Sequence, residues 1–286
     1  MNPVLYKVSI LLILYRLCVL HVLDVHAVVK LFNKRNDKMN IQMQSEAIIS
    51  GSRAALGQFP WHVILRRDEE DTLLCGGSII SNKWVLTASH CIYNLSSVLL
   101  TFGTIDLFNY ENNMTSTKLY TYPDFDAENI INDISLIELP TPLNFTKNIK
   151  SIGLVSSIEA SNDFVGAEGI IIGFGQTANI AEDSSDVLLW ANVEIINITT
   201  CAKAYEEESI EDTVMCGIGY NNNADISPCD GDSGGALVWK NKYNNYVQIG
   251  IISFTVKNKC SEYPTGYTKI TSYLNYINNI TGLNFD

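Results

Sequence analysis

Short apolar runs separated by turn residues make up the sequence from residue 48 onward, and they restrict the fold more than any other feature. Several runs are rich in β-branched residues and are bounded by Gly, Asn, Asp or Pro, which is typical of β-strands. The runs are GGSIISNKWVLTAS, TFGTIDLF, NDISLIELP, GAEGIIIGFG, SDVLLWANVEII, SGGALVWK and YVQIGIISF. Helical spacing appears only over 272–281, where Tyr273, Ile277 and Ile280 fall on one face. The sequence therefore predicts an all-β barrel or sandwich with a C-terminal α-helix, and an α+β fold is the weaker alternative.

The N-terminal segment has the pattern of a secretory signal. Lys7 supplies a positive charge, residues 8–23 are largely apolar, and Val25-His26-Ala27 resembles a cleavage site. Arg16 interrupts the apolar run, and a charge at the bilayer centre costs about 2.5–3.5 kcal/mol, which argues against a membrane-spanning helix. A buried N-terminal helix is the alternative. The predicted organisation is a signal peptide over 1–27, a polar pro-segment over 28–47 and a secreted, extracellular domain over 48–286.

The cysteines and the glycosylation sequons agree with export. Of the seven cysteines, Cys18 lies in the predicted signal, and the even number that remains suits three disulfides. The remaining cysteines are Cys75, Cys91, Cys201, Cys216, Cys229 and Cys260. Asn-X-Ser/Thr sequons fit a secreted surface, and their asparagines are Asn94, Asn113, Asn144, Asn197 and Asn279.

Charge and motif content narrow the classes of partner. The formal net charge is −12, and such a surface repels nucleic acid and anionic membranes. The sequence contains neither C-x-x-C nor H-E-x-x-H, so we predict no metal site and no cofactor.

The segment CDGDSGGAL surrounds Ser233 with three glycines and two aspartates. Glycine lets the backbone approach a ligand closely, so the turn is suited to presenting a hydroxyl, and an ordinary hairpin loop is the alternative. A serine nucleophile needs a general base, which is usually histidine. Of the four histidines, His21 and His26 lie in the predicted signal. His62 follows Pro-Trp at the start of a predicted strand and is interpreted as structural, which leaves His90 in LTASHC.

An imidazole base in turn needs a buried acceptor that fixes its tautomer. Asp133 fits this role because it precedes the apolar stretch of NDISLIEL, and a simple strand-start aspartate is the alternative.

The motifs TASHC, DISLIEL and GDSGG, in that order, resemble those of the chymotrypsin-like serine proteases. Further similar segments are IISGSRAALGQFPWHV, CGGSII, IIIGFGQT, GIISF and PTGYTKI, so that the resemblance covers residues 48–286. It implies two six-stranded antiparallel Greek-key β-barrels followed by a C-terminal helix, with the catalytic groups between the barrels. It also implies that Ser233 is the nucleophile, that His90 is the base, and that Asp133 orients His90.

The resemblance assigns further roles around the serine. The backbone N–H groups of Gly231 and Ser233 are expected to form the oxyanion hole, and Asp232 is expected to pair with the α-amino group released at Ile48. The disulfide pairs that it implies are Cys75–Cys91, Cys201–Cys216 and Cys229–Cys260.

By motif register, Ser227 lies at the base of the substrate pocket, with Ser253 and the walls Thr255 and Thr265 around it. The uncharged base excludes a trypsin-like preference for Lys or Arg. Threonine at both walls narrows the pocket and resembles elastases, which predicts cleavage after small or medium aliphatic residues. A chymotrypsin-like preference for large hydrophobic residues is the alternative.

The residue before the expected new N-terminus departs from the family pattern. Ala47 precedes Ile48, where Arg or Lys is common in the family, and a small residue there suits self-activation by an elastase-like enzyme. The rival interpretation is a catalytically inactive homologue that acts as a binding protein. The expected partners are protein or peptide substrates and protein protease inhibitors, and we expect a monomer.

Overall fold

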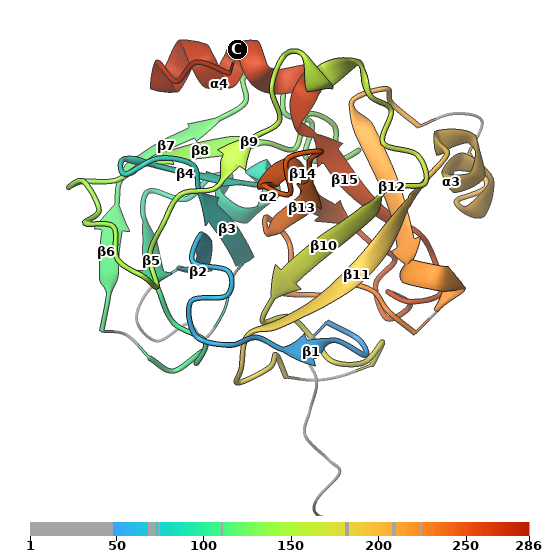
Figure 1. Ribbon diagram of the computed structural model, residues 1–286, viewed down its shortest axis with the longest axis horizontal. Helices are drawn as coiled ribbons and strands as arrows, with labels where there is room; N and C mark the ends of the chain where they lie inside the picture. The colour runs from blue at the N-terminus through green and yellow to red at the C-terminus, as the bar shows by residue number, and fades with distance from the viewer. Residues whose placement is uncertain are drawn as a thin grey trace, which may run out of the picture. The chain divides into compact units, whose positions relative to one another are not determined.

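The computed structural model describes residues 48–67, 73, 75–109, 111–180, 183–207, 210–223 and 225–285 (Figure 1). They belong to one compact unit, Glu46–Asp286. The predicted signal peptide and pro-segment, including Cys18 and Ala47, lie outside the described residues. Within the described part of the chain, no helix is both long and apolar enough to cross a bilayer.

The first half of the domain forms a nearly closed antiparallel barrel. Its strands are β2 (His62–Arg66), β3 (Cys75–Ile79), β4 (Trp84–Thr87), β5 (Val98–Phe102), β6 (Asn113–Ser116), β7 (Lys118–Thr121) and β8 (Ser135–Glu138). They pair in the order β6-β5-β2-β3-β4-β8-β7. Since only Thr117 separates β6 from β7, these two strands act as one, and the barrel has six staves.

The second half forms a closed antiparallel barrel with the same topology. Its strands are β10 (Glu168–Gly173), β11 (Leu189–Ile196), β12 (Val214–Gly219), β13 (Ala236–Lys240), β14 (Tyr246–Phe254) and β15 (Thr265–Lys269). They pair in the order β11-β10-β13-β14-β15-β12, and β12 closes the ring on β11. In both barrels the strands follow the ring order first, second, third, sixth, fifth, fourth, which is a Greek-key arrangement. The predicted pair of six-stranded barrels is confirmed.

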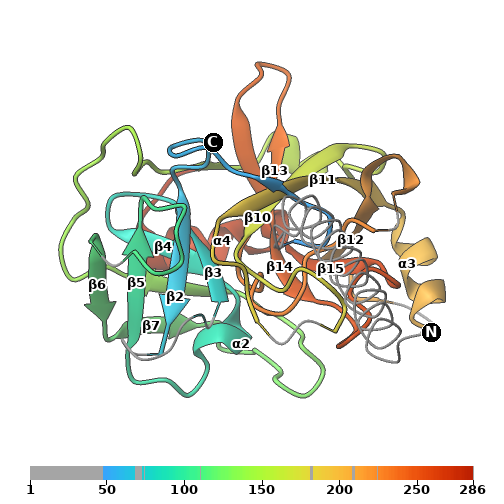
Figure 2. The same cartoon turned by 90° about the horizontal axis from the view of Figure 1, so that it is seen from below.

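Two short strands add to the sheet of the second barrel. β1 (Ser52–Arg53) pairs with β11, and β9 (Gly153–Leu154) runs parallel to β14. Along β11, buried positions alternate with half-buried ones, as expected for a strand with one face toward the core. The two barrels lie side by side, with β2–β8 on one side of the domain and β10–β15 on the other, in both views (Figures 1 and 2).

A buried polar contact joins the two barrels. The Ser78 hydroxyl on β3 donates to Gln248 Oε1 on β14 at 2.7 Å, and both residues are buried. The Gln248 amide then donates to the Gly250 carbonyl at 3.0 Å. These hydrogen bonds satisfy polar atoms that are costly to bury unpaired.

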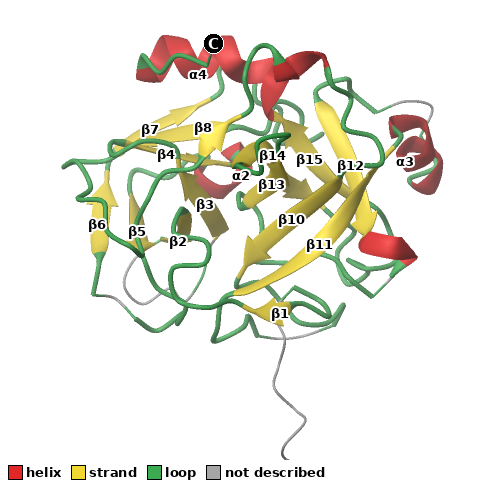
Figure 3. Ribbon diagram, in the orientation of Figure 1, coloured by secondary structure: helices red, strands yellow, loops and turns green. Residues whose placement is uncertain are grey.

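Figure 3 shows the C-terminal helix α4 along one edge of the domain and α3 at another. The predicted C-terminal helix consists of a 3₁₀ turn, Ile270–Tyr273, followed by α4 (Leu274–Thr281), and Ile277 is fully buried. The predicted C-terminal helix is confirmed. Two further helices, α2 (Ser89–Ile92) and α3 (Ile198–Ala204), also form, and both are too short to show helical periodicity in the sequence. The run TFGTIDLF is also strand only as far as Phe102, since Gly103 turns the chain with a positive φ of 68°.

Candidate active site

The short helix α2 places His90 at the end of the first barrel. The helix follows β4, and the Cys75–Cys91 disulfide ties it to β3. Asp133, which lies just before β8, accepts two hydrogen bonds from His90: the backbone N–H reaches Oδ1 at 2.9 Å, and ring Nδ1 lies 2.8 Å from Oδ2. The Asp133 side chain is 1% exposed and the His90 side chain is 28% exposed.

This geometry fixes the tautomer of His90. A carboxylate accepts hydrogen bonds, so Nδ1 carries the proton and the neutral ring keeps the lone pair of Nε2. The Nε2 atom lies 3.8 Å from Cys91 Sγ, a disulfide sulfur that is at most a weak acceptor. The ring is therefore oriented as a base, with its acceptor nitrogen away from Asp133.

The second barrel also holds Asp133. The Ser253 hydroxyl on β14 donates to Asp133 Oδ2 at 2.6 Å, and the Thr268 hydroxyl on β15 donates to the Asp133 carbonyl at 2.8 Å. Ser253 was predicted only as a residue around the substrate pocket, and the contact of Thr268 was not predicted. No local sequence pattern predicts either contact, because Ser253 and Thr268 lie 120 and 135 residues from Asp133 along the chain.

Ser233 lies in a turn that both barrels hold in place. Its carbonyl accepts from the Gly76 N–H on β3 at 2.7 Å, and the Gly234 N–H donates to the Ile252 carbonyl on β14 at 2.8 Å. Gly231 and Gly234 have positive φ values of 97° and 79°, a conformation that favours glycine. Any Cβ at Gly234 would also lie 2.3 Å from Thr87 Oγ1. Backbone geometry therefore requires glycine at Gly231 and Gly234, and Ser233 between them remains partly exposed.

The backbone donors on either side of Asp232 are available to a ligand. Among the described residues, the N–H groups of Gly231 and Ser233 donate to no protein acceptor. Unpaired backbone donors in a glycine-rich turn are the arrangement that an oxyanion hole needs.

Asp232 is fully buried beneath this turn. It accepts the Gly175 N–H on Oδ1 at 2.8 Å and the Cys229 N–H on Oδ2 at 2.9 Å. Burial raises the pKa of Asp232 to about 7, and the two backbone donors offset only part of that effect. An ideal Cβ on Gly173 would lie 1.9 Å from Asp232 Oδ1, so glycine is required there.

The segment that begins with Ile48 enters the domain beside the predicted pocket base. Ile48 is fully buried, and the Ile49 N–H donates to the Ser227 carbonyl at 3.0 Å. Ile49 therefore lies against the segment that leads to the serine turn.

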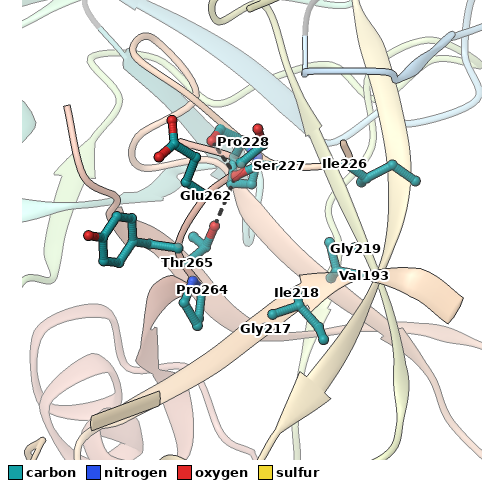
Figure 4. Close-up of a pocket in the computed structure, with 12 residues that line it drawn as sticks. Val193, Gly217, Ile218, Gly219, Ile226, Ser227, Pro228, Glu262, Pro264 and Thr265 are labelled. Atoms are coloured by element: carbon teal, nitrogen blue, oxygen red, sulfur yellow. Dashed lines mark hydrogen bonds between the residues drawn. The ribbon is translucent and has the colours of Figure 1, made fainter. Parts of the chain in front are cut away.

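A pocket of about 270 Å³ adjoins the predicted substrate pocket (Figure 4). Two of the predicted pocket residues, Ser227 and Thr265, line it, whereas Ser253 and Thr255 do not. The Ser227 hydroxyl lies 2.8 Å from the Cys260 carbonyl and 2.9 Å from the Pro228 carbonyl, so its proton is engaged by the backbone. Thr265 Oγ1 lies 3.4 Å from Ser227 Oγ. The predicted base, Ser227, is therefore uncharged, and Glu262 is the acidic residue among those that line this pocket.

The cysteines, the sequon asparagines and His62 were also given roles in the sequence analysis. The described residues contain three disulfides, Cys75–Cys91, Cys201–Cys216 and Cys229–Cys260, which are the pairs that the resemblance implies. All five sequon asparagines are exposed. His62 is buried against Phe174, and burial lowers its pKa to about 3, which agrees with a structural role.

Two Greek-key barrels, with a His–Asp pair on the first and a glycine-rich serine turn on the second, define the class of chymotrypsin-like serine proteases. The family model described as Trypsin matches residues 48–277. The chain is 32% identical over 247 residues to a protein named collagenase from Hypoderma lineatum, covering 85% of this chain and 91% of that protein. A solved structure titled HL collagenase is also similar, with a TM-score of 0.73 at 32% identity, covering 83% of this chain and 100% of that one. The chain therefore belongs to the trypsin family and is a serine endopeptidase.

Proposed function

We propose that this enzyme cleaves peptide bonds through an acyl-enzyme formed on Ser233, with His90 as the base and Asp133 as the residue that orients it. The observation that carries the proposal is the 2.8 Å contact between His90 Nδ1 and the buried Asp133 carboxylate, which leaves Nε2 as the proton acceptor. The Ser233 oxygen attacks the substrate carbonyl while its proton passes to Nε2. His90 then donates that proton to the leaving amine, and water releases the acyl group by the reverse sequence.

The negative charge that develops on the carbonyl oxygen is stabilised by the free N–H groups of Gly231 and Ser233. Loss of one such donor typically costs about 3–4 kcal/mol of transition-state stabilisation. The positive φ of Gly231, 97°, supports this role, because the turn directs backbone donors without steric interference from a side chain.

We propose that Ser227, Thr255 and Thr265 select small or medium aliphatic residues on the acyl side of the cleaved bond. Ser227 supplies no negative charge that could pair with a basic side chain, and its hydroxyl proton is held by backbone carbonyls. In a peptide library, kcat/KM should be highest for Ala, Val or Leu at this position, and at least about 100-fold lower for Lys and Arg, because an unpaired buried cation is costly. Native collagen should be tested as a substrate beside the peptide library, because a relative is named a collagenase.

Widening the pocket provides the matched test. Replacing Thr255 and Thr265 together by glycine should raise kcat/KM for Phe relative to Ala by about 10-fold, because each wall loses a β-branched side chain. A native preference for Phe or Tyr would support the chymotrypsin-like alternative and contradict the proposed role of the two threonines.

We propose that cleavage of Ala47–Ile48 activates the enzyme and that the new α-ammonium group pairs with Asp232. In the uncleaved chain Asp232 lacks this α-ammonium partner, and burial raises its pKa from the ordinary 3.8 to about 7. Because the unfolded chain releases this proton at a lower pH than the folded chain, the free energy of unfolding falls as pH rises from about 4 to about 7. The shift corresponds to roughly 4 kcal/mol at neutral pH. Thermal unfolding of Ser233→Ala should therefore show a pH-dependent loss of stability before cleavage that is absent after it.

The cleaved sample is prepared by incubating Ser233→Ala with a trace of active enzyme, and N-terminal sequencing should find Ile48. Failure to cut at this bond contradicts self-activation. The control is Asp232→Asn in the uncleaved chain, which should remove the pH-dependent loss. Identical pH profiles for cleaved and uncleaved protein would contradict the pairing of Asp232 with the new terminus.

We further propose that residues 1–27 direct export and that residues 28–47 are removed on activation. The three disulfides and the exposed sequon asparagines support an oxidising, extracellular environment. The proposed partners are protein substrates, and protein inhibitors that occupy the same substrate pocket.

A further inference from the structure

A side-chain contact links two loops that lie 82 residues apart in the sequence. Asn179 belongs to the segment after β10, and Ser261 follows Cys260 in the loop that borders the pocket. The Ser261 N–H donates to Asn179 Oδ1 at 3.0 Å, and Asn179 Nδ2 donates to Ser261 Oγ at 3.1 Å. Asn179 therefore uses both ends of its amide on one residue of the pocket loop.

Each end of this contact leads to the serine turn. On one side, the Gly175 N–H donates to Asp232 Oδ1, and the Gln176 N–H donates to the Asp230 carbonyl, both at 2.8 Å. The Asn179 segment is thus fixed to the turn that carries Ser233.

On the other side, the neighbour of Ser261 reaches the same turn. The Cys260 carbonyl accepts the Ser227 hydroxyl at 2.8 Å, and the disulfide joins Cys260 to Cys229, whose N–H donates to Asp232 Oδ2. The contacts form a closed ring that runs from Asp232 through Asn179 and Ser261 back to Asp232. Figure 4 shows Ser227, the residue that donates to the Cys260 carbonyl, on the lining of the pocket.

We infer that Asn179 is a positioning residue that holds the pocket loop against the serine turn and thereby sets the shape of the substrate pocket. The inference rests on the proposed catalytic function. Asn179 touches neither of the two catalytic side chains of His90 and Asp133, and it acts through Ser261 and Cys260 on Ser227. Its loss should weaken binding of the substrate side chain and leave the proton-transfer step unchanged.

The test compares Asn179→Ala with the wild type on two peptides that differ only in Leu or Gly at the cleaved position. We expect KM for the Leu peptide to rise about 10-fold, with kcat within about 2-fold, because two hydrogen bonds to the pocket loop are lost. For the Gly peptide, which places no side chain in the pocket, both constants should change less than about 2-fold.

Conservative and control variants make the result specific. Asn179→Asp keeps the acceptor for the Ser261 N–H and should return KM for the Leu peptide to within about 3-fold of wild type. Ile180→Ala changes the next side chain, which is 82% exposed, and should behave as wild type. Ser261→Ala removes only the hydroxyl partner and should raise KM for the Leu peptide about 3-fold; it also provides the test if Asn179→Ala does not fold.

Unchanged discrimination between Leu and Gly in Asn179→Ala and Ser261→Ala overturns the inference. A loss of kcat that is equal for both peptides also overturns it, since that result indicates a general defect of the serine turn. If the wild type itself forms no acyl-enzyme, the proposed catalytic function is wrong, and this outcome is distinct from a wild-type enzyme that tolerates both substitutions.

Discussion

Replacing Ser233 by alanine should lower kcat for a good peptide substrate by about 10⁶-fold, with little change in KM. The substitution removes the atom that forms the acyl bond, whereas the turn, the pocket and the free backbone donors of Gly231 and Ser233 remain. Residual turnover should come from substrate binding and the oxyanion hole alone. Steady-state kinetics on the chain with a free Ile48 terminus measures the effect.

Two controls accompany this prediction. Ser272→Ala changes an exposed serine in the 3₁₀ turn before α4 and should retain full activity. The Ser233→Ala protein should keep its melting temperature within a few degrees, because the side chain is partly exposed and makes no hydrogen bond to the described residues. A Ser233→Ala enzyme that kept a tenth of the wild-type kcat would show that another residue is the nucleophile.

Asp133→Asn should lower kcat by about 10⁴-fold, the second largest effect that we expect. The Asp133 carboxylate accepts hydrogen bonds from three donors: the His90 N–H, ring Nδ1 and the Ser253 hydroxyl. An amide replaces one acceptor oxygen by a donor. The ring then has to accept at Nδ1 and carry its proton on Nε2, so His90 can no longer take the proton of Ser233.

Ser253→Ala is the matched control for this prediction. It removes one donor to Asp133 and leaves the tautomer of His90 unchanged, so kcat should fall by about 10-fold or less. Parallel kinetics and circular dichroism of both variants separate loss of the base from loss of the fold. Equal effects of the two substitutions would contradict the assignment of Asp133 as the residue that fixes the tautomer.

The sequence predicted the elements that local patterns encode. Alternating apolar stretches such as SDVLLWANVEII predicted strands, and GDSGG predicted a turn with an exposed hydroxyl, because glycine at positive φ has a strong local cause. The C-terminal helix was predicted from a single apolar face. The strand β12, which closes the second barrel, was not predicted, because its partners β11 and β15 rather than its own composition make it a strand.

The candidate site was predictable as residue types but not as a network. His90, Asp133 and Ser233 follow from motifs, and the resemblance supplied their expected roles. The contacts of Ser253 and Thr268 with Asp133 and the contact of Asn179 with Ser261 arise only when distant segments meet in the fold. The engagement of the Ser227 hydroxyl by the Cys260 carbonyl likewise depends on how the loop around the disulfide folds.

Covalent labelling tests the central claim most directly. The chain with a free Ile48 terminus is treated with an organophosphonate, digested and mapped by mass spectrometry. We predict one equivalent of phosphonyl adduct, located on Ser233, with no adduct on Ser233→Ala and much slower labelling of Asp133→Asn. A correctly cleaved and folded sample that forms no adduct, or forms it on a different residue, would contradict this account.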